Sequence, residues 1–169
     1  MRKTTLAIAF AAVLVPAVSI AQGPPSCSKL LVSSANENRG RAATLFSATK
    51  TVDLTLTALF QPKLSGDHLL ELRLFTPDGN LYRSMTVPIT STARTPGGRS
   101  VAGHPRPVVE KVLSKYRDAT GNFLQASVPF PVAGTDIVSS SLYGQWRIDA
   151  YLDNAPAPCV RAATFTINP

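Results

Sequence analysis

The chain has 169 residues, a formal net charge of +7 at pH 7 and an aromatic content of 7%. A chain of this length buries enough apolar surface for one domain with its own core. Beyond the first 21 residues no apolar run approaches the ~20 residues that a membrane-spanning helix requires. The sequence therefore predicts no membrane span.

The first 21 residues have the features of a bacterial secretory signal peptide. Arg2 and Lys3 form a short positive region, residues 6–18 are almost wholly apolar, and small residues occupy positions 19 and 21. We expect cleavage after Ala21, which leaves a single domain of residues 22–169. Removing Arg2 and Lys3 lowers the net charge from +7 to +5. Sec export predicts a secreted or periplasmic location, where a nucleic-acid partner is not expected.

Two cysteines remain, Cys27 and Cys159, near the two ends of the exported chain. In an oxidising compartment we expect them to form one disulfide that joins the first strand to the last. Closing so long a loop stabilises by up to about 5 kcal/mol in the chain-entropy model. No CxxC spacing supports a redox or metal-bound pair. Lipidation of Cys27 is the remaining alternative, but residues 23–26 lack the expected apolar-small pattern.

Strands are predicted in the first half of the chain by alternation of apolar and polar residues. Residues 27–34 and 42–48 are plausible strands, and residues 51–59 place Val52, Leu54 and Leu56 on one face. Residues 68–75 repeat the pattern, and Leu81 to Ile89 forms the return strand. Between them, Thr76-Pro77-Asp78-Gly79-Asn80 is a strong turn signal, so these two strands form a predicted hairpin.

Residues 90–107 form a long predicted loop rich in Ser, Thr, Arg, Gly and Pro. Its positive charge comes from Arg94, Arg99 and Arg106, and no acidic residue occurs between Asp78 and Glu110. Structureless loops of this length are uncommon and are usually either functional or disordered. Both interpretations remain open from the sequence.

Residues 108–116 fit either a strand or one face of a helix. We favour a strand, because the turn signal at 118–122 leads into residues 123–130 and would complete a second hairpin. Strands are also predicted at 135–142, at 146–152 with Trp146 facing inward, and at 159–167. About eight strands with no convincing helix predict an all-β fold, an antiparallel two-sheet sandwich.

Three stretches resemble bacterial immunoglobulin-like domains of secreted and envelope proteins. Residues 72–82 resemble the Pro-Asp-Gly hairpin of such modules, residues 143–153 their penultimate strand with its Gly-x-Trp opening, and residues 163–167 their final strand. The resemblance implies an immunoglobulin-like sandwich and no particular activity. Terminal cysteines and a late Trp146 depart from antibody-type domains.

The residues that usually carry chemistry are sparse. His68 and His104 are the only histidines, too few for a His/Cys metal site, and no calcium-loop spacing occurs. Asp67 and His68 are neighbours on a predicted strand, so their side chains should point to opposite faces. There is no Gly-x-Ser-x-Gly elbow and no phosphate-binding loop. We therefore predict no catalytic residues, no metal and no cofactor, with an unrecognised hydrolase as the third alternative.

Two binding roles remain. The first is a protein-binding or assembly module whose partner is another envelope or extracellular protein, with Arg94, Arg99 and Arg106 at the contact surface. The second is a carbohydrate-binding module, for which Tyr82 and Tyr151 fall on outward strand phases. The low aromatic content speaks against the second role.

Overall fold

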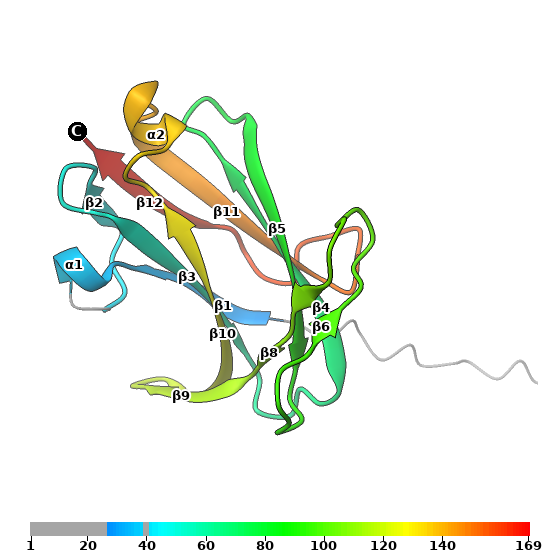
Figure 1. The fold of residues 1–169 in the computed structure, drawn as a ribbon. Coiled ribbons are helices and arrows are strands. Elements are labelled where there is room, and N and C mark those ends of the chain that lie inside the picture. The colour runs from blue at the N-terminus through cyan, green and yellow to red at the C-terminus, as the bar shows by residue number, and fades with distance from the viewer. Residues whose placement is uncertain (1–26, 39–40) are drawn as a thin grey trace, which may run out of the picture.

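The computed structural model describes residues 27–38 and 41–169. The signal peptide predicted for residues 1–21 lies outside the described residues. Two β-sheets pack face to face and enclose one hydrophobic core (Figure 1). The predicted all-β sandwich is confirmed.

The first sheet has four antiparallel strands in the order β1-β3-β10-β9. They are β1 (Cys27–Ser33), β3 (Asp53–Phe60), β10 (Gly121–Pro131) and β9 (Ser114–Asp118). Leu54, Leu56 and Ala58 of β3 alternate into the core. Val52 was expected to share that face, but it is exposed because the strand, and with it the alternation, begins only at Asp53.

The second sheet has six strands in the order β2-β12-β11-β4-β5-β8. They are β2 (Leu45–Ser47), β12 (Ala163–Asn168), β11 (Gly144–Leu152), β4 (Asp67–Phe75), β5 (Leu81–Thr90) and β8 (Lys111–Val112). Pairing is antiparallel except for β12 with β2 and β5 with β8. The predicted β4–β5 hairpin is present, and Gly79 supplies the positive φ of 82° that its turn requires.

The strand order is that of an immunoglobulin-like domain. Immunoglobulin sandwiches place strands A-B-E-D in one sheet and G-F-C in the other, and variable-type domains add C′ beside C. Here β1-β3-β10-β9 takes the first order and β12-β11-β4-β5 the second. The fold-level resemblance seen in the sequence is thus confirmed by the topology.

Trp146 of β11 is fully buried at the centre of the core, as expected from its inward phase. Its ring lies 5.1 Å from that of Tyr82 and 6.3 Å from that of Phe165. Its indole N–H donates a 3.0 Å hydrogen bond to the carbonyl of Leu142, so burial leaves the polar end of the ring satisfied.

The chain between β10 and β11 differs from the prediction. Residues 135–142 were expected to form a strand, but they hold the short helix α2 (Asp136–Ser139) and a turn. Thr135 caps this helix by accepting a hydrogen bond from the Ile137 N–H, and only the Ile137 side chain of the helix is buried. Local capping outweighs the β-branched composition here. A second short helix, α1 (Ala35–Asn38), follows β1.

Residues 108–116 form strands and not a helix. They contribute β7 (Val108–Val109), β8 and the start of β9, which pairs with β10 as the predicted second hairpin. The C-terminal strand is shorter than expected, because residues 159–162 precede β12 as a connection.

Candidate partner-binding site

The predicted loop at 90–107 folds back as a small hairpin. Strand β6 (Gly98–Arg99) pairs with β7, and the Glu110 N–H donates to the Gly97 carbonyl at 2.8 Å. Val101, in the loop between β6 and β7, is buried. Gly98 lies against Pro107: a Cβ atom added at position 98 would lie 3.0 Å from the Cβ of Pro107. We call residues 94–110 the basic hairpin.

Arg94 holds the two ends of the basic hairpin together. Its guanidinium donates to both carboxylate oxygens of Glu110, at 2.9 Å from Nε and 2.7 Å from Nη2. Nη2 also lies 3.1 Å from both oxygens of Asp67 at the start of β4. The Glu110 side chain is only 5% exposed, so this two-point contact compensates a buried negative charge.

The charges in this cluster stabilise one another. Hydrogen bonds from Thr90 and then from Arg94 hold the pKa of Asp67 below its usual value. Glu110 first, and Asp67 second, raise the pKa of Arg94. Both carboxylates therefore serve to fix one guanidinium, an arrangement that suits anchoring a loop better than transferring protons.

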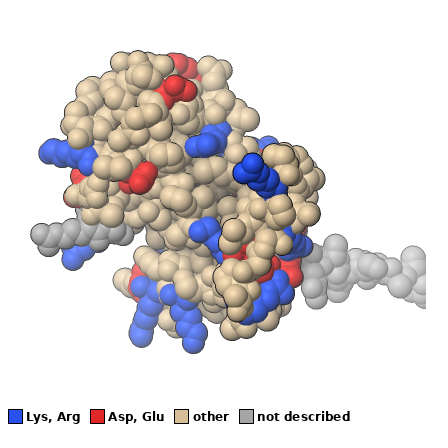
Figure 2. Space-filling model, viewed as in Figure 1, with Lys and Arg blue, Asp and Glu red and all other residues tan. Residues whose placement is uncertain are grey.

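Arg99 and Arg106 lie on the outer part of the basic hairpin and are exposed. Neither forms a hydrogen bond or an ion pair with another residue that the structure describes. A hollow of about 250 Å³ at the base of the hairpin is lined by Arg94, Arg99 and Glu110, and Arg106 does not border it. Basic and acidic side chains meet in this region of the surface (Figure 2). Of the three arginines singled out in the sequence, one is bound internally and two remain available.

Tyr82 and Tyr151 do not form an exposed aromatic platform. A register shift in the β4–β5 pair, where Leu74 faces Arg83 but Phe75 faces Leu81, turns the Tyr82 ring inward. That ring packs edge-on against Phe130 and Trp146. The outward phase predicted for Tyr82 was therefore wrong. The ring of Tyr151 is covered by the guanidinium of Arg73 at 4.1 Å.

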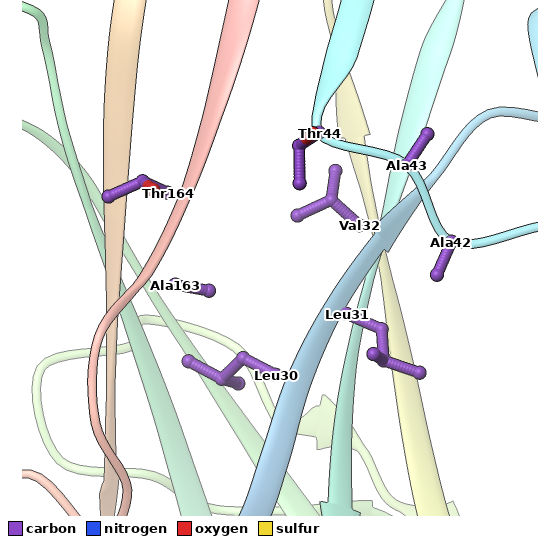
Figure 3. A pocket seen from close by; sticks show the side chains of 8 residues that line it. All are labelled: Leu30, Leu31, Val32, Ala42, Ala43, Thr44, Ala163 and Thr164. Atoms are coloured by element: carbon purple, nitrogen blue, oxygen red, sulfur yellow. The ribbon is translucent and has the colours of Figure 1, made fainter. Parts of the chain in front are cut away.

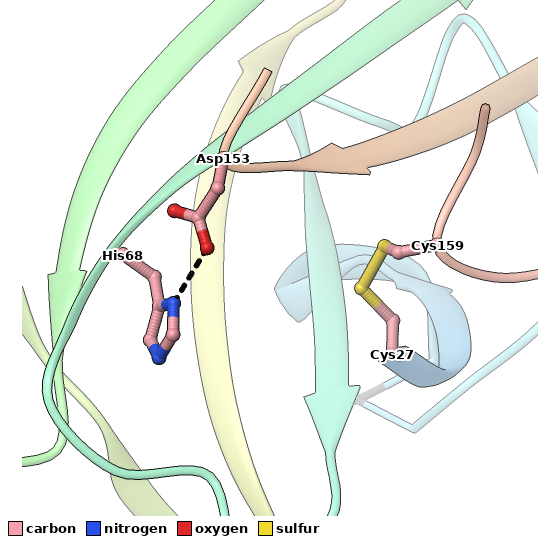
Figure 4. The surroundings of a disulfide bond; sticks show 4 residues. All are labelled: Cys27, His68, Asp153 and Cys159. Atoms are coloured by element: carbon pink, nitrogen blue, oxygen red, sulfur yellow. Dashed lines mark hydrogen bonds and ion pairs between the residues drawn. A yellow bond between two sulfur atoms is a disulfide. The ribbon is translucent and has the colours of Figure 1, made fainter. Parts of the chain in front are cut away.

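His68 and Asp67 have separate partners, in keeping with the opposite faces expected for them. His68 Nδ1 lies 2.7 Å from Asp153 Oδ2 (Figure 4). The Nε2 atom of the same ring lies 3.0 Å from the Ser65 carbonyl oxygen. Asp153 also accepts a 2.8 Å hydrogen bond from the Leu69 N–H. These contacts fix the turn after β11 to the start of β4. His104 is exposed near the tip of the basic hairpin.

The predicted disulfide is present between Cys27 and Cys159, with 5.2 Å between their Cα atoms (Figure 4). It joins the start of β1 to the connection that precedes β12, and so not to the last strand itself. Within residues 27–38 and 41–169 no group of three His, Cys, Asp or Glu residues is placed to hold a metal ion. No helix in the same residues is long and apolar enough to cross a membrane.

Comparisons with known proteins find similarity among solved structures and none among sequence families. No protein-family model matches the chain, and no curated protein does. A crystal structure described as an immunoglobulin-like protein from Pseudomonas aeruginosa is similar over 85% of this chain and 95% of its own, with 13% sequence identity and a TM-score of 0.40. The immunoglobulin-like fold is defined here by the strand order and not by this similarity.

Proposed function

We propose that this chain is a non-enzymatic protein-binding or assembly module that acts in the bacterial envelope or outside the cell. The observation that carries the proposal is the basic hairpin, which is held in place by Arg94 and presents Arg99 and Arg106 without a hydrogen bond or an ion pair among the described residues. A pre-ordered loop loses less conformational entropy when it binds than a mobile one.

The chemistry of the hairpin favours an acidic partner surface. Arginine forms forked hydrogen bonds with carboxylates, and two unpaired guanidinium groups on one short hairpin fit a pair of such groups. The location rests on the signal features of residues 1–21 and agrees with the disulfide, since disulfides persist in oxidising compartments.

A comparison of charge-matched variants tests this proposal. The immobilised chain is exposed to an envelope extract of the source cells beside R99S/R106S and beside K115S/R117S, which removes the same charge from exposed positions on β9. A partner should be retained by the parent and by the β9 variant, and lost from the hairpin variant and at high salt. Equal retention by all three would remove the hairpin from the proposal.

A further inference from the structure

A hollow lies between the edges of the two sheets, away from the basic hairpin. It has a volume of about 450 Å³ and is bordered by β1 on one side and β12 on the other. Leu30 and Ala163 lie on facing sides of the gap (Figure 3). Val32, Ala43 and Thr44 complete the end where β1 and the following segment meet. We call this hollow the edge groove.

Both ends of the edge groove are closed by the chain itself. At one end the segment after α1 crosses from the first sheet to the second: the Ala43 N–H donates to the Val32 carbonyl, and the Thr166 N–H donates to the Thr44 carbonyl, each at 2.8 Å. At the other end the disulfide ties the start of β1 to the connection before β12. The groove is thus an opening framed at both ends and bordered by the partly exposed apolar side chains of Leu30, Ala43 and Ala163.

The backbone along the groove offers unused strand-pairing groups. Successive residues of a strand direct their N–H and C=O groups to opposite edges. The Thr166 N–H points away from β11, towards β2, so Thr164 presents its own N–H and C=O to the same edge. Strand β2 pairs only with Thr166, Ile167 and Asn168, and no described strand pairs with Thr164 on that side.

Strand β1, on the other side of the groove, also has backbone groups that face away from its sheet. The Val32 carbonyl points away from β3, because it accepts from Ala43, and Leu30 shares that orientation. Free edges of this kind are templates for an added strand. An extended segment in line with β2 would pair with Thr164 and direct alternate side chains into the groove beside Leu30 and Ala163.

Positive charge beside the edge groove favours a bound segment that carries acidic residues. Arg41 directly precedes the lining residue Ala42, and Arg161 lies two residues before the lining residue Ala163; both are exposed and neither has an ion pair among the described residues. A second copy of this chain would bring the same positive charges to the contact. A segment with acidic residues at its ends would neutralise them.

We propose that the edge groove binds an extended segment of a partner protein by strand addition, with small apolar residues alternating inside and acidic residues at both ends. This inference rests on the proposed protein-binding function but places a second contact site, independent of the basic hairpin.

A peptide titration tests the proposal. The probe is the fluorescein-labelled peptide Asp-Val-Thr-Val-Thr-Val-Asp with blocked ends, titrated with the disulfide-intact chain and followed by anisotropy. T164P removes the N–H at the free edge without touching the ladder to β11, since proline is tolerated at edges. We expect T164P to weaken binding at least about ten-fold, the matched T164V to leave it nearly unchanged, and R41E/R161E to weaken it as T164P does.

The peptide gives an independent arm if T164P does not fold. N-methylation of its central valine, which removes one backbone donor, should reduce binding to the parent chain, as should replacing both aspartates by lysine. R99S/R106S should bind the peptide as the parent does, which separates this site from the basic hairpin. Saturable binding that follows this pattern supports the proposal. Absence of binding, binding indifferent to T164P and to N-methylation, or dimerisation of the chain through Thr164 would overturn it, whatever the hairpin test shows.

Discussion

Arg94 and Glu110 are 16 residues apart in the sequence and form a two-point ion pair that closes the basic hairpin at its base. Asp67 of β4 holds the same guanidinium, so the hairpin is attached to the second sheet. The structure therefore separates the three arginines into one that positions the hairpin and two that are free to bind.

Replacing the positioning residue should loosen the hairpin. R94A leaves the buried Glu110 carboxylate without its cation, so we expect a lower melting temperature and trypsin cleavage after Arg99 that is faster by on the order of ten-fold. The double variant R94M/E110L should melt higher than R94A, because it removes the buried charge together with its partner. A melting temperature and a cleavage rate for R94A equal to those of the parent would refute the anchoring role.

Tyr82 should matter for stability and not for sugar binding. Y82S opens a cavity beside Trp146 and Phe130 and should lower the free energy of unfolding by about 3–5 kcal/mol. Y151S, on the outer face of the same sheet, should cost less than about 1.5 kcal/mol. Urea denaturation followed by tryptophan fluorescence measures both. Similar small losses for the two variants would mean that the Tyr82 ring does not pack in the core.

The disulfide should contribute to stability without being part of the hairpin site. C27S/C159S removes a cross-link between residues 132 apart and should lower the free energy of unfolding by about 2–5 kcal/mol. Partner binding through Arg99 and Arg106 should persist below the new melting temperature. Peptide binding to the edge groove should weaken, because the disulfide frames one end of it. Denaturation curves and the anisotropy titration, run on the same preparation, measure the loss of stability and the loss of peptide binding.

Asp118 links stability to pH in the acid range. Hydrogen bonds from Thr120 and then from Lys29 lower the pKa of Asp118 to about 2. Because the folded-state pKa lies below the unfolded value of about 3.9, the stabilisation is complete above that value and is lost as the pH falls towards 2. NMR titration of the carboxyl should show this low pKa, and D118N should abolish the corresponding part of the acid destabilisation. A titration midpoint near 4 would contradict the contacts in this turn.

The sequence predicted best where local patterns decide the structure. The β4–β5 hairpin follows from strict alternation and a Pro-Asp-Gly turn, and Trp146 from its place in an alternating strand. The disulfide followed from two cysteines in a chain that is predicted to be exported. The helix α2 was missed because Ile137 and Val138 suggest a strand, whereas Thr135 caps a single helical turn.

The remaining features depend on contacts that the sequence pattern does not contain. One register shift between β4 and β5 reverses the phase of Tyr82. The ion pair of Arg94 requires the loop to return to Glu110, and the edge groove requires β1 and β12 to face each other across two sheets. For the ion pair of Arg94, the only signal in the sequence is Glu110, an acidic residue at the end of a long basic loop.

Site-specific photocrosslinking in the source cells tests the central claim most directly. A photoreactive residue replaces His104, which is exposed near the tip of the basic hairpin, and in a second strain it replaces Lys115 on β9. We predict a discrete protein adduct from position 104 that is absent from position 115 and disappears when R99S/R106S is added. No adduct from position 104, or the same adducts from both positions, would contradict a partner-binding role for the basic hairpin.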